Sequence, residues 1–127
     1  MKTKSWIDKE RDSEKKDIEN RALEFANKIR IFVKKLNETT ANKEDVKKII
    51  NSSGSIGANY IKAHNSSNKK DFLQQIKICQ EKAEESRFWL SLLDTDWNPE
   101  QELERKKLIH ETTGLINTFN LILHSEK

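Results

Sequence analysis

Near the middle of the chain the sequence reads Ser52-Ser53-Gly54-Ser55-Ile56-Gly57-Ala58-Asn59-Tyr60. This stretch holds two of the three glycines of the chain, although the apolar residues around it follow the spacing of a helix. A glycine inside a helix costs about 1 kcal/mol relative to alanine. Ser53 and Gly57 lie four residues apart, which places them as a low ridge on one helix face. We therefore expect another helix, or a neighbouring subunit, to approach closely at this ridge.

Four segments of the chain carry apolar residues at alternating steps of three and four, which is the pattern of amphipathic helices. We expect these helices at about residues 17–37, 43–65, 69–93 and 99–124. The side chains that this spacing turns toward a common core are Ile18, Ala22, Phe25, Ile29, Phe32, Leu36, Val46, Ile49, Ser53, Ile56, Tyr60, Ala63, Phe72, Ile76, Cys79, Ala83, Ser86, Leu90, Leu93, Leu108, Thr112, Leu115, Phe119 and Ile122. Leu23, Ala26 and Val33 widen the first row, which indicates either a wider core or a second interface with another subunit.

Each of the last three helices follows an asparagine, whose side-chain oxygen can accept a hydrogen bond from an amide of the first helical turn. We expect Asn42, Asn68 and Asn98 to act as these N-caps. The last of the three signals is the sharpest, because Pro99 fills the first helical position and Gln101 completes a capping box.

Helices joined by short polar loops predict an all-α, up-down-up-down four-helix bundle over residues 17–127. The chain has one proline and three glycines, which leaves little material for the turns of a β-protein. Residues 1–16 are highly charged, and we expect a separate tail or a helix extension there. Trp89 adds bulk beside the core. Because a buried tryptophan removes about 150–250 Å² from water, Trp89→Ala should be among the most destabilising single changes.

Charge is distributed unevenly along a chain whose formal net charge is +3. Residues 1–93 carry 20 basic and 14 acidic groups, whereas residues 94–127 carry 4 basic and 7 acidic groups. Such asymmetry is compatible with a basic region for a polyanion or an acidic partner, but an ordinary solvated helix surface explains it better. The candidate nucleic-acid-binding residues are Lys28, Arg30, Lys34, Lys35, Lys47, Lys48 and Lys62. Aromatic residues are not interleaved with these cations in the sequence, which gives base stacking little support.

Side chains able to do chemistry do not converge in the sequence. His64, His110 and His124 lack a cysteine or histidine partner at helical spacing, so we expect no metal site and no cofactor. Glu81 and Glu85 lie on one helix face, and only this pair of carboxylates would suggest acid–base catalysis. A solvated acidic face explains the pair better. We therefore expect a protein without catalytic residues.

Cys79 is the only cysteine, which excludes an intrachain disulfide, and its apolar neighbours favour a small buried side chain over a nucleophile. The charged N-terminal segment lacks the apolar run of a signal peptide. No apolar stretch reaches the roughly 20 residues that a membrane span requires. We therefore expect a cytoplasmic protein with no membrane partner.

Two parts of the sequence together resemble a known family. The first is Ser53-Gly54-Ser55-Ile56-Gly57-Ala58-Asn59-Tyr60, with Ser67 and Lys70-Asp71-Phe72 after it, and the second is Ala83-Glu84-Glu85-Ser86-Arg87-Phe88-Trp89-Leu90. They resemble the four-helix-bundle proteins called 23S rRNA intervening-sequence proteins, and they are similar to the accessory variability proteins of diversity-generating retroelements. The similarity covers roughly residues 20–124. Its structural signature consists of Ser53, Gly57, Asn59, Tyr60, Glu85 and Trp89.

The resemblance implies a small bundle that assembles as a ring-like homopentamer and has no established enzymatic activity. For the accessory branch it also implies nucleic acid, as RNA or DNA, and a reverse transcriptase as partners. Lys62 and Lys82 depart from the pattern, because the family commonly has acidic residues at these two positions. Asn59 and Glu85 match the pattern, and we expect a polar contact between them that joins the second and third helices.

These observations favour a non-enzymatic oligomeric scaffold that binds nucleic acid electrostatically through several subunits at once. The alternative is a protein-interaction adaptor, for example for a reverse transcriptase, with no direct role in nucleic-acid binding. The scaffold would lose affinity for nucleic acid as the salt concentration rises. The adaptor would bind none even at low salt.

Overall fold

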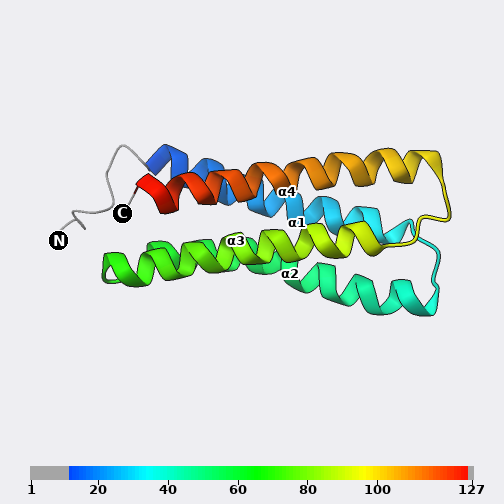
Figure 1. The fold of residues 1–127 in the computed structure, drawn as a ribbon, viewed down its shortest axis with the longest axis horizontal. Helices are drawn as coiled ribbons and strands as arrows, with labels where there is room; N and C mark the ends of the chain where they lie inside the picture. The colour runs from blue at the N-terminus through cyan, green and yellow to red at the C-terminus, as the bar shows by residue number, and fades with distance from the viewer. Residues whose placement is uncertain (1–11, 126–127) are drawn as a thin grey trace.

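The computed structural model describes residues 12–125, and four α-helices account for most of them. They are α1 (Asp12–Lys34), α2 (Thr40–His64), α3 (Lys69–Leu92) and α4 (Pro99–Ser125). Successive helices run in opposite directions along the bundle (Figure 1). Residues 12–125 contain no strand. The expected all-α fold of four antiparallel helices is therefore confirmed.

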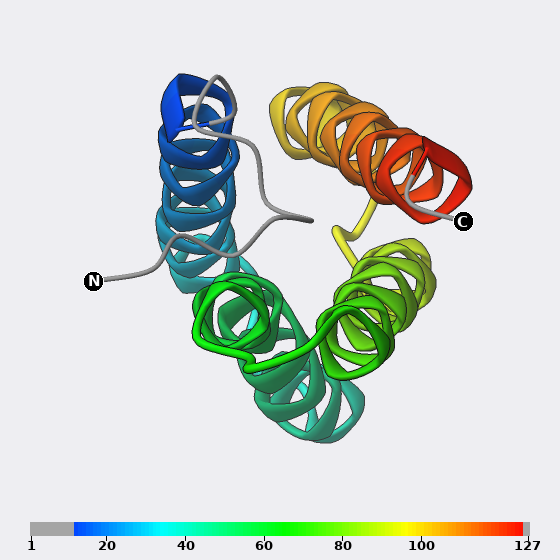
Figure 2. The same ribbon diagram turned by 90° about the vertical axis from the view of Figure 1, so that its left-hand side faces the viewer.

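The four helices surround one apolar core. Each helix packs against the next one in the chain, and α4 returns to the side of α1 (Figure 2). The α2/α3 pair packs most extensively, whereas α1 and α4 touch least. Every side chain expected in the core rows is buried except that of Val46, which is partly buried. The helical spacing of the sequence thus identifies the core.

The tight packing of α2 against α3 includes a buried polar contact. The hydroxyl oxygens of Ser52 and Ser86 are 2.9 Å apart across this interface. Each hydroxyl also lies near a carbonyl of its own helix, Ser86 near that of Lys82 at 2.9 Å and Ser52 near that of Ile49 at 3.4 Å, so either serine can donate to the other. Small hydroxyl side chains therefore fill the interface, and a hydrogen bond of this kind contributes about 0.5–1.5 kcal/mol.

Two of the three expected N-caps are confirmed. The Asn68 side chain accepts a hydrogen bond from the Asp71 amide at 2.8 Å. The Asn98 side chain accepts one from the Gln101 amide at 3.0 Å. The expected capping box is wrong, because the Gln101 side chain donates to the Lys35 carbonyl at 2.9 Å instead of turning back to its own helix. This bond ties the start of α4 to the end of α1.

The third expected N-cap, Asn42, is wrong. Thr39 caps α2, since its side chain accepts from the Asn42 amide at 3.0 Å. The Asn42 side chain is buried, and it donates to the carbonyls of Asn37 and Asp94 at 3.0 and 2.9 Å. Its oxygen accepts from the Asp94 amide at 2.9 Å. A contact with the distant α3–α4 loop therefore occupies the side chain that was expected to cap the helix.

The first helix is shifted from its expected bounds. It begins at Asp12 rather than near residue 17, and it ends at Lys34. Asp12 and Glu14 lie in its first turn, where carboxylates interact favourably with the positive end of the helix dipole. Residues 12–16 of the charged segment are therefore helical, while residues 1–11 lie outside the described part of the chain.

Candidate functional site

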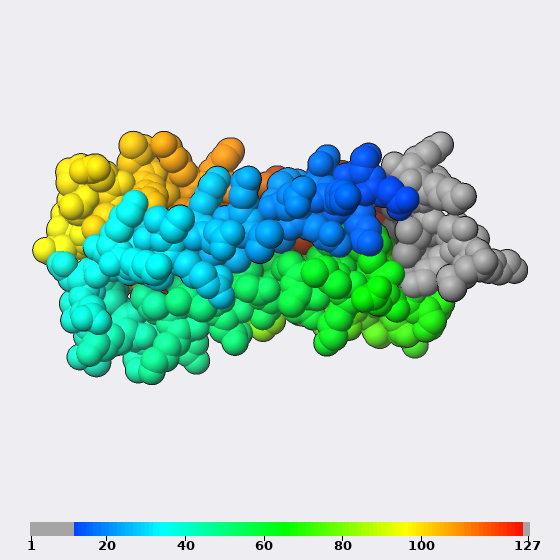
Figure 3. Space-filling view, turned by 180° about the vertical axis from the view of Figure 1, so that it is seen from behind, coloured from blue at the N-terminus to red at the C-terminus, as the bar shows by residue number. Residues whose placement is uncertain are grey.

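A groove runs along the surface between α1 and α2. Its volume is about 510 Å³, and Figure 3 shows the face on which these two helices lie side by side. The small residues that line it are Ala22, Ala26, Gly54, Gly57 and Ala58. Leu23 and Ile61 also line it and are 63% and 52% exposed. The groove therefore offers apolar surface that the bundle itself leaves uncovered.

Gly57 explains why α1 and α2 lie close enough to form this groove. A Cβ atom at position 57 would lie 3.4 Å from the Cβ atom of Ala22, at the tight end of van der Waals contact. On the opposite side of α2, Ser52 makes its hydrogen bond with α3. The small-residue stretch thus lets α2 approach two helices, and the expected close approach of another helix is confirmed.

Leu23 differs in burial from the two other residues that widen the first apolar row. The row formed by Leu23, Ala26 and Val33 indicated either a wider core or a second interface. Ala26 is buried and Val33 is partly buried, but Leu23 is mostly exposed at the edge of the groove. Ala26 and Val33 therefore widen the core, whereas Leu23 lies on the outer surface.

Two of the expected nucleic-acid-binding residues, Lys28 and Lys35, lie where α1 faces α4. The Lys28 ammonium is 3.1 Å from the Glu111 carboxylate. The Lys35 ammonium is 3.1 Å from the Glu104 carboxylate. Both lysines are thus paired with acidic residues of the bundle itself, which reduces the positive charge that they offer to a polyanion.

Other basic residues gather on the opposite side of α1, beside α2. Arg30 lines the groove, and Lys34 lies one helical turn further along α1. Lys43 and Lys47 line a second hollow of about 450 Å³ between the α1–α2 loop and the start of α2. We name Arg30, Lys34, Lys43 and Lys47 the basic face. Lys43 belongs to the basic patch that the sequence places at the start of the second helix, together with Lys47 and Lys48, although it is not one of the seven candidate residues.

The basic face is only partly neutralised by acidic groups. The Lys47 ammonium is 3.5 Å from Glu44. The Arg30 guanidinium donates to the Ala26 carbonyl at 3.3 Å, in its own helix. Within residues 12–125, Arg30 and Lys34 have no carboxylate within ion-pair distance. Lys48 and Lys62 also lack such a partner, so Arg30 and Lys34 are the two candidate residues of α1 that keep their charge unpaired within this part of the chain.

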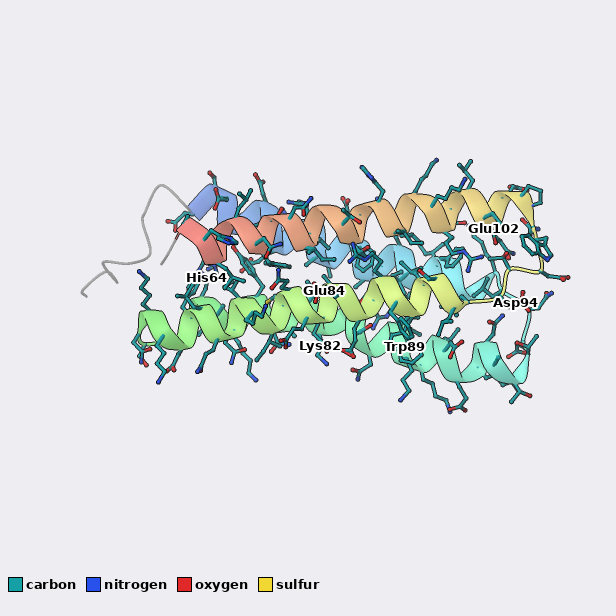
Figure 4. All side chains as sticks on the ribbon, viewed as in Figure 1. His64, Lys82, Glu84, Trp89, Asp94 and Glu102 are labelled. Atoms are coloured by element: carbon teal, nitrogen blue, oxygen red, sulfur yellow. The ribbon has the colours of Figure 1, made fainter. Side chains whose placement is uncertain are left out.

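Lys48 and Lys62 lie elsewhere on α2. The Lys48 ammonium is 6.0 Å from the centre of the Trp89 ring, on the α2 side of α3 (Figure 4). Trp89 is half-buried and packs edge-on against Phe88, with ring centres 5.0 Å apart. Lys62 is exposed. The fold thus brings an aromatic ring beside one of the candidate lysines, although the two lie far apart in the sequence.

The expected contact between Asn59 and Glu85 does not form. The Asn59 side-chain amide donates to the Ser55 carbonyl of its own helix at 2.8 Å. The Glu85 carboxylate is 3.1 Å from the Lys82 ammonium, one turn away on α3. Each side chain therefore takes a local partner, and α2 and α3 are joined by the serine pair instead.

Cys79 and His64 are packed among other side chains rather than presented to solvent. Burial raises the pKa of the Cys79 thiol to about 12, which keeps the thiol neutral and unreactive. The His64 ring lies between Tyr60 and Phe72, with ring centres 4.7 and 5.4 Å away. Figure 4 shows His64 at the end of the bundle opposite Asp94 and Glu102.

Residues 12–125 lack two further features. No group of three or more histidine, cysteine, aspartate or glutamate side chains is arranged to hold a metal ion within this part of the chain. None of its four helices combines the length and the apolar character that crossing a membrane requires.

The fold is similar to a crystal structure from Bacteroides thetaiotaomicron, that of a protein of unknown function from the S23 ribosomal protein family. The two chains share 27% sequence identity with a TM-score of 0.70, and the match covers 84% of this chain and 97% of the other. A scan against protein-family models gives no match, and a search of curated proteins finds no similar sequence. The similarity supports a helical bundle related in structure to that protein.

Proposed function

We propose that this chain is a non-enzymatic scaffold that assembles with copies of itself and binds nucleic acid through its basic face. The observation that carries the proposal is the groove between α1 and α2, in which exposed apolar residues lie beside Arg30. The resemblance to intervening-sequence proteins adds a ring-like homopentamer as the form of the assembly. Such a ring would repeat each basic face several times.

Self-association is supported by the shape and composition of the groove. The exposed side chains of Leu23 and Ile61 line the groove together with alanines and glycines. A side chain of another subunit can therefore enter the groove and bury apolar area. Burial of one leucine-sized side chain contributes about 1.5–3 kcal/mol before the entropy of association is deducted. Several such contacts around a ring would be needed for a stable assembly.

Nucleic-acid binding is supported by the unequal distribution of charge on α1. Arg30 and Lys34 project from the side of the helix next to α2 and lack carboxylate partners among residues 12–125. A lysine or arginine that neutralises a phosphate releases counterions, which makes binding fall with salt concentration. In a ring, several subunits would contact the same nucleic acid, so a modest affinity per subunit would give a higher overall affinity.

A protein-interaction adaptor, for example for a reverse transcriptase, is the second candidate function. It is favoured by the pairing of Lys28 with Glu111 and of Lys35 with Glu104, because these bonds leave a smaller basic surface than the sequence predicts. An adaptor would use the groove for a helix of another protein rather than for a second copy of the chain.

Gel retardation of a single-stranded and a double-stranded oligonucleotide at rising salt concentration tests the nucleic-acid role. The double variant Arg30→Gln/Lys34→Gln should weaken binding and reduce the slope of log affinity against log salt by about 0.7–0.9 for each phosphate that it no longer neutralises. Lys28→Gln/Lys35→Gln is the matched control, because it removes the same charge from two lysines that are paired with carboxylates of α4. Equal losses of affinity in the two variants would contradict the basic face as the binding surface. No binding by the wild type at low salt would favour the adaptor.

A further inference from the structure

The loop between α3 and α4 presents an exposed tryptophan at one end of the bundle. Trp97 is 87% exposed, more than any other large apolar residue in the described part of the chain. Asp96 and Trp97 both have positive φ angles, of 53° and 59°. This left-handed conformation is unfavourable for a bulky side chain. The fold therefore holds Trp97 in a costly backbone conformation while its side chain lies outside the core.

Hydrogen bonds brace this loop on the side that faces the bundle. Asn42 binds both the amide and the carbonyl of Asp94, each at 2.9 Å. The Asp94 carboxylate accepts from the Asp96 amide at 2.8 Å. Behind the loop, the buried Thr95 hydroxyl donates to Glu102. These bonds fix the backbone on both sides of Trp97, so its ring projects from a rigid support.

Arg105 completes the support from α4. Its guanidinium pairs with the Glu102 carboxylate and donates to the Leu90 carbonyl at 3.2 Å and to the Leu93 carbonyl. The end of α3, the loop and the first turns of α4 are thereby joined through one side chain. Figure 4 shows Asp94 and Glu102 together at this end of the bundle.

The loop that carries Trp97 is rich in carboxylates, and the cations Arg105, Lys106 and Lys107 follow in α4. Between residues 94 and 104 the chain has five carboxylates and no lysine or arginine. Glu102 is paired with Arg105, and Glu104 is paired with Lys35. The remaining three, Asp94, Asp96 and Glu100, are exposed and have no cation within ion-pair distance among residues 12–125. An exposed indole thus stands among carboxylates that lack counter-charges.

We propose that Trp97 anchors an arginine-containing segment of a protein partner at this loop. A guanidinium stacks on the indole face through a cation–π contact. Neighbouring cations of the same segment pair with Asp94, Asp96 and Glu100. Arginine fits this arrangement better than lysine, because its planar group stacks on aromatic rings and is more weakly hydrated. The same carboxylates repel phosphate groups, which keeps nucleic acid away from this loop.

This contact uses an indole and carboxylates rather than the cations of the basic face, so it does not rest on the proposed nucleic-acid role. The two surfaces adjoin, because Asn42, which binds Asp94, lines the same hollow as Lys43 and Lys47. The rigid support matters for affinity, because an anchor that is already held in place loses little conformational entropy when a partner binds. Exposed tryptophans and arginines are also the residues that most often dominate binding energy at protein interfaces.

Binding of two peptides to the full chain tests the proposal. One is a peptide of about eight arginines and the other is a lysine peptide of the same length, each followed by fluorescence polarisation. The wild type should bind the arginine peptide more tightly than the lysine peptide, by up to about fivefold, because a lysine ammonium also makes a cation–π contact but does not stack on the ring. Trp97→Ala should lose this preference, and Trp97→Phe should keep part of it. Asp96→Asn/Glu100→Gln should reduce the affinity for both peptides by the same factor.

Controls separate this site from general attraction between opposite charges. Glu81→Gln/Glu84→Gln removes two exposed carboxylates from α3 and should leave both affinities unchanged. Circular dichroism checks that Trp97→Ala keeps the fold, as expected for an exposed side chain. Equal binding of the two peptides by the wild type would overturn the proposal. So would an arginine preference that survives Trp97→Ala, or a short oligothymidine that binds more tightly than either peptide and depends on Trp97.

Discussion

Gly57 of α2 faces Ala22 of α1, and both residues line the groove between the two helices. A Cβ atom added at position 57 would lie 3.4 Å from the Ala22 Cβ atom. One methyl group fits at this distance with little adjustment, but a longer side chain would have to displace α1. The glycine therefore sets both the spacing of the two helices and the depth of the groove.

Two replacements of Gly57 distinguish the effect of helix propensity on stability from the effect of packing against α1. Gly57→Ala should change the free energy of unfolding by less than about 1 kcal/mol, because better helix propensity offsets a tight contact. Gly57→Leu should cost about 1–3 kcal/mol, because the added atoms overpack the α1/α2 interface. Urea denaturation followed by circular dichroism measures both. A fully tolerated Gly57→Leu would mean that α1 does not lie against this residue.

Asn42 should matter far more than a helix cap at the same place would. Asn42→Ala leaves the amide and carbonyl of Asp94 without their partner and should cost about 1–3 kcal/mol. Thr39→Ala removes the actual cap and should cost about 1 kcal/mol. Chemical denaturation of the two variants gives the comparison. A larger loss of stability for Thr39→Ala would contradict the assignment of the two roles.

Replacement of the buried Phe25 by alanine should destabilise the fold more than replacement of the larger but half-buried Trp89. Phe25 is completely buried, so Phe25→Ala should cost about 3–5 kcal/mol through reduced burial and a cavity. Trp89 keeps contact with solvent and packs against Phe88 and Lys48, so Trp89→Ala should cost less. Thermal denaturation ranks the two variants, and a lower melting temperature for Trp89→Ala would restore the sequence-based expectation.

The helices and their buried faces could be predicted because local signals and the fold agree. Alternating steps of three and four residues place Phe25 and Phe119 in the core, where the structure has both. The caps at Asn68 and Asn98 are equally local, since each bond closes within three residues. Among residues 12–125, no hydrogen-bond partner from another helix competes for these two side chains.

The parts that could not be predicted depend on residues that meet only in the folded chain. Asn42 has a good cap sequence, but the distant Asp94 binds its side chain. Lys28 looks like an exposed cation until α4 brings Glu111 beside it. Leu23 has the spacing of a core residue, but it lies at the edge where α1 and α2 leave a groove. The core was therefore predictable and the surface was not.

Acid should weaken the fold partly through Glu102. The hydrogen bond from the Thr95 hydroxyl, together with Arg105, holds the pKa of this carboxyl below its ordinary value of 4.5. Because the folded pKa is the lower one, the ionised group stabilises the fold above about pH 4.5. That contribution is lost as the pH falls through the lowered pKa.

Glu102→Gln tests this pH dependence. The difference in melting temperature between the wild type and the variant should be largest at neutral pH and should shrink as the pH falls toward about 3. Glu100→Gln removes an exposed carboxylate from the same end of α4 and is the matched control. A difference that is constant over this range would show that Glu102 does not carry the effect.

The most direct test of assembly through the groove is the molar mass in solution. Light scattering measures it for the wild type and for Ala58→Trp at equal concentration. Ala58 is exposed and lines the groove, so a tryptophan there fills the groove without entering the core. Asn51→Trp places the same side chain on an exposed position of α2 outside the groove and serves as control. The wild type and Asn51→Trp should have the mass of an oligomer, five copies on the resemblance, and Ala58→Trp a smaller mass. A monomeric wild type, or an unchanged mass for Ala58→Trp, would contradict assembly through this groove.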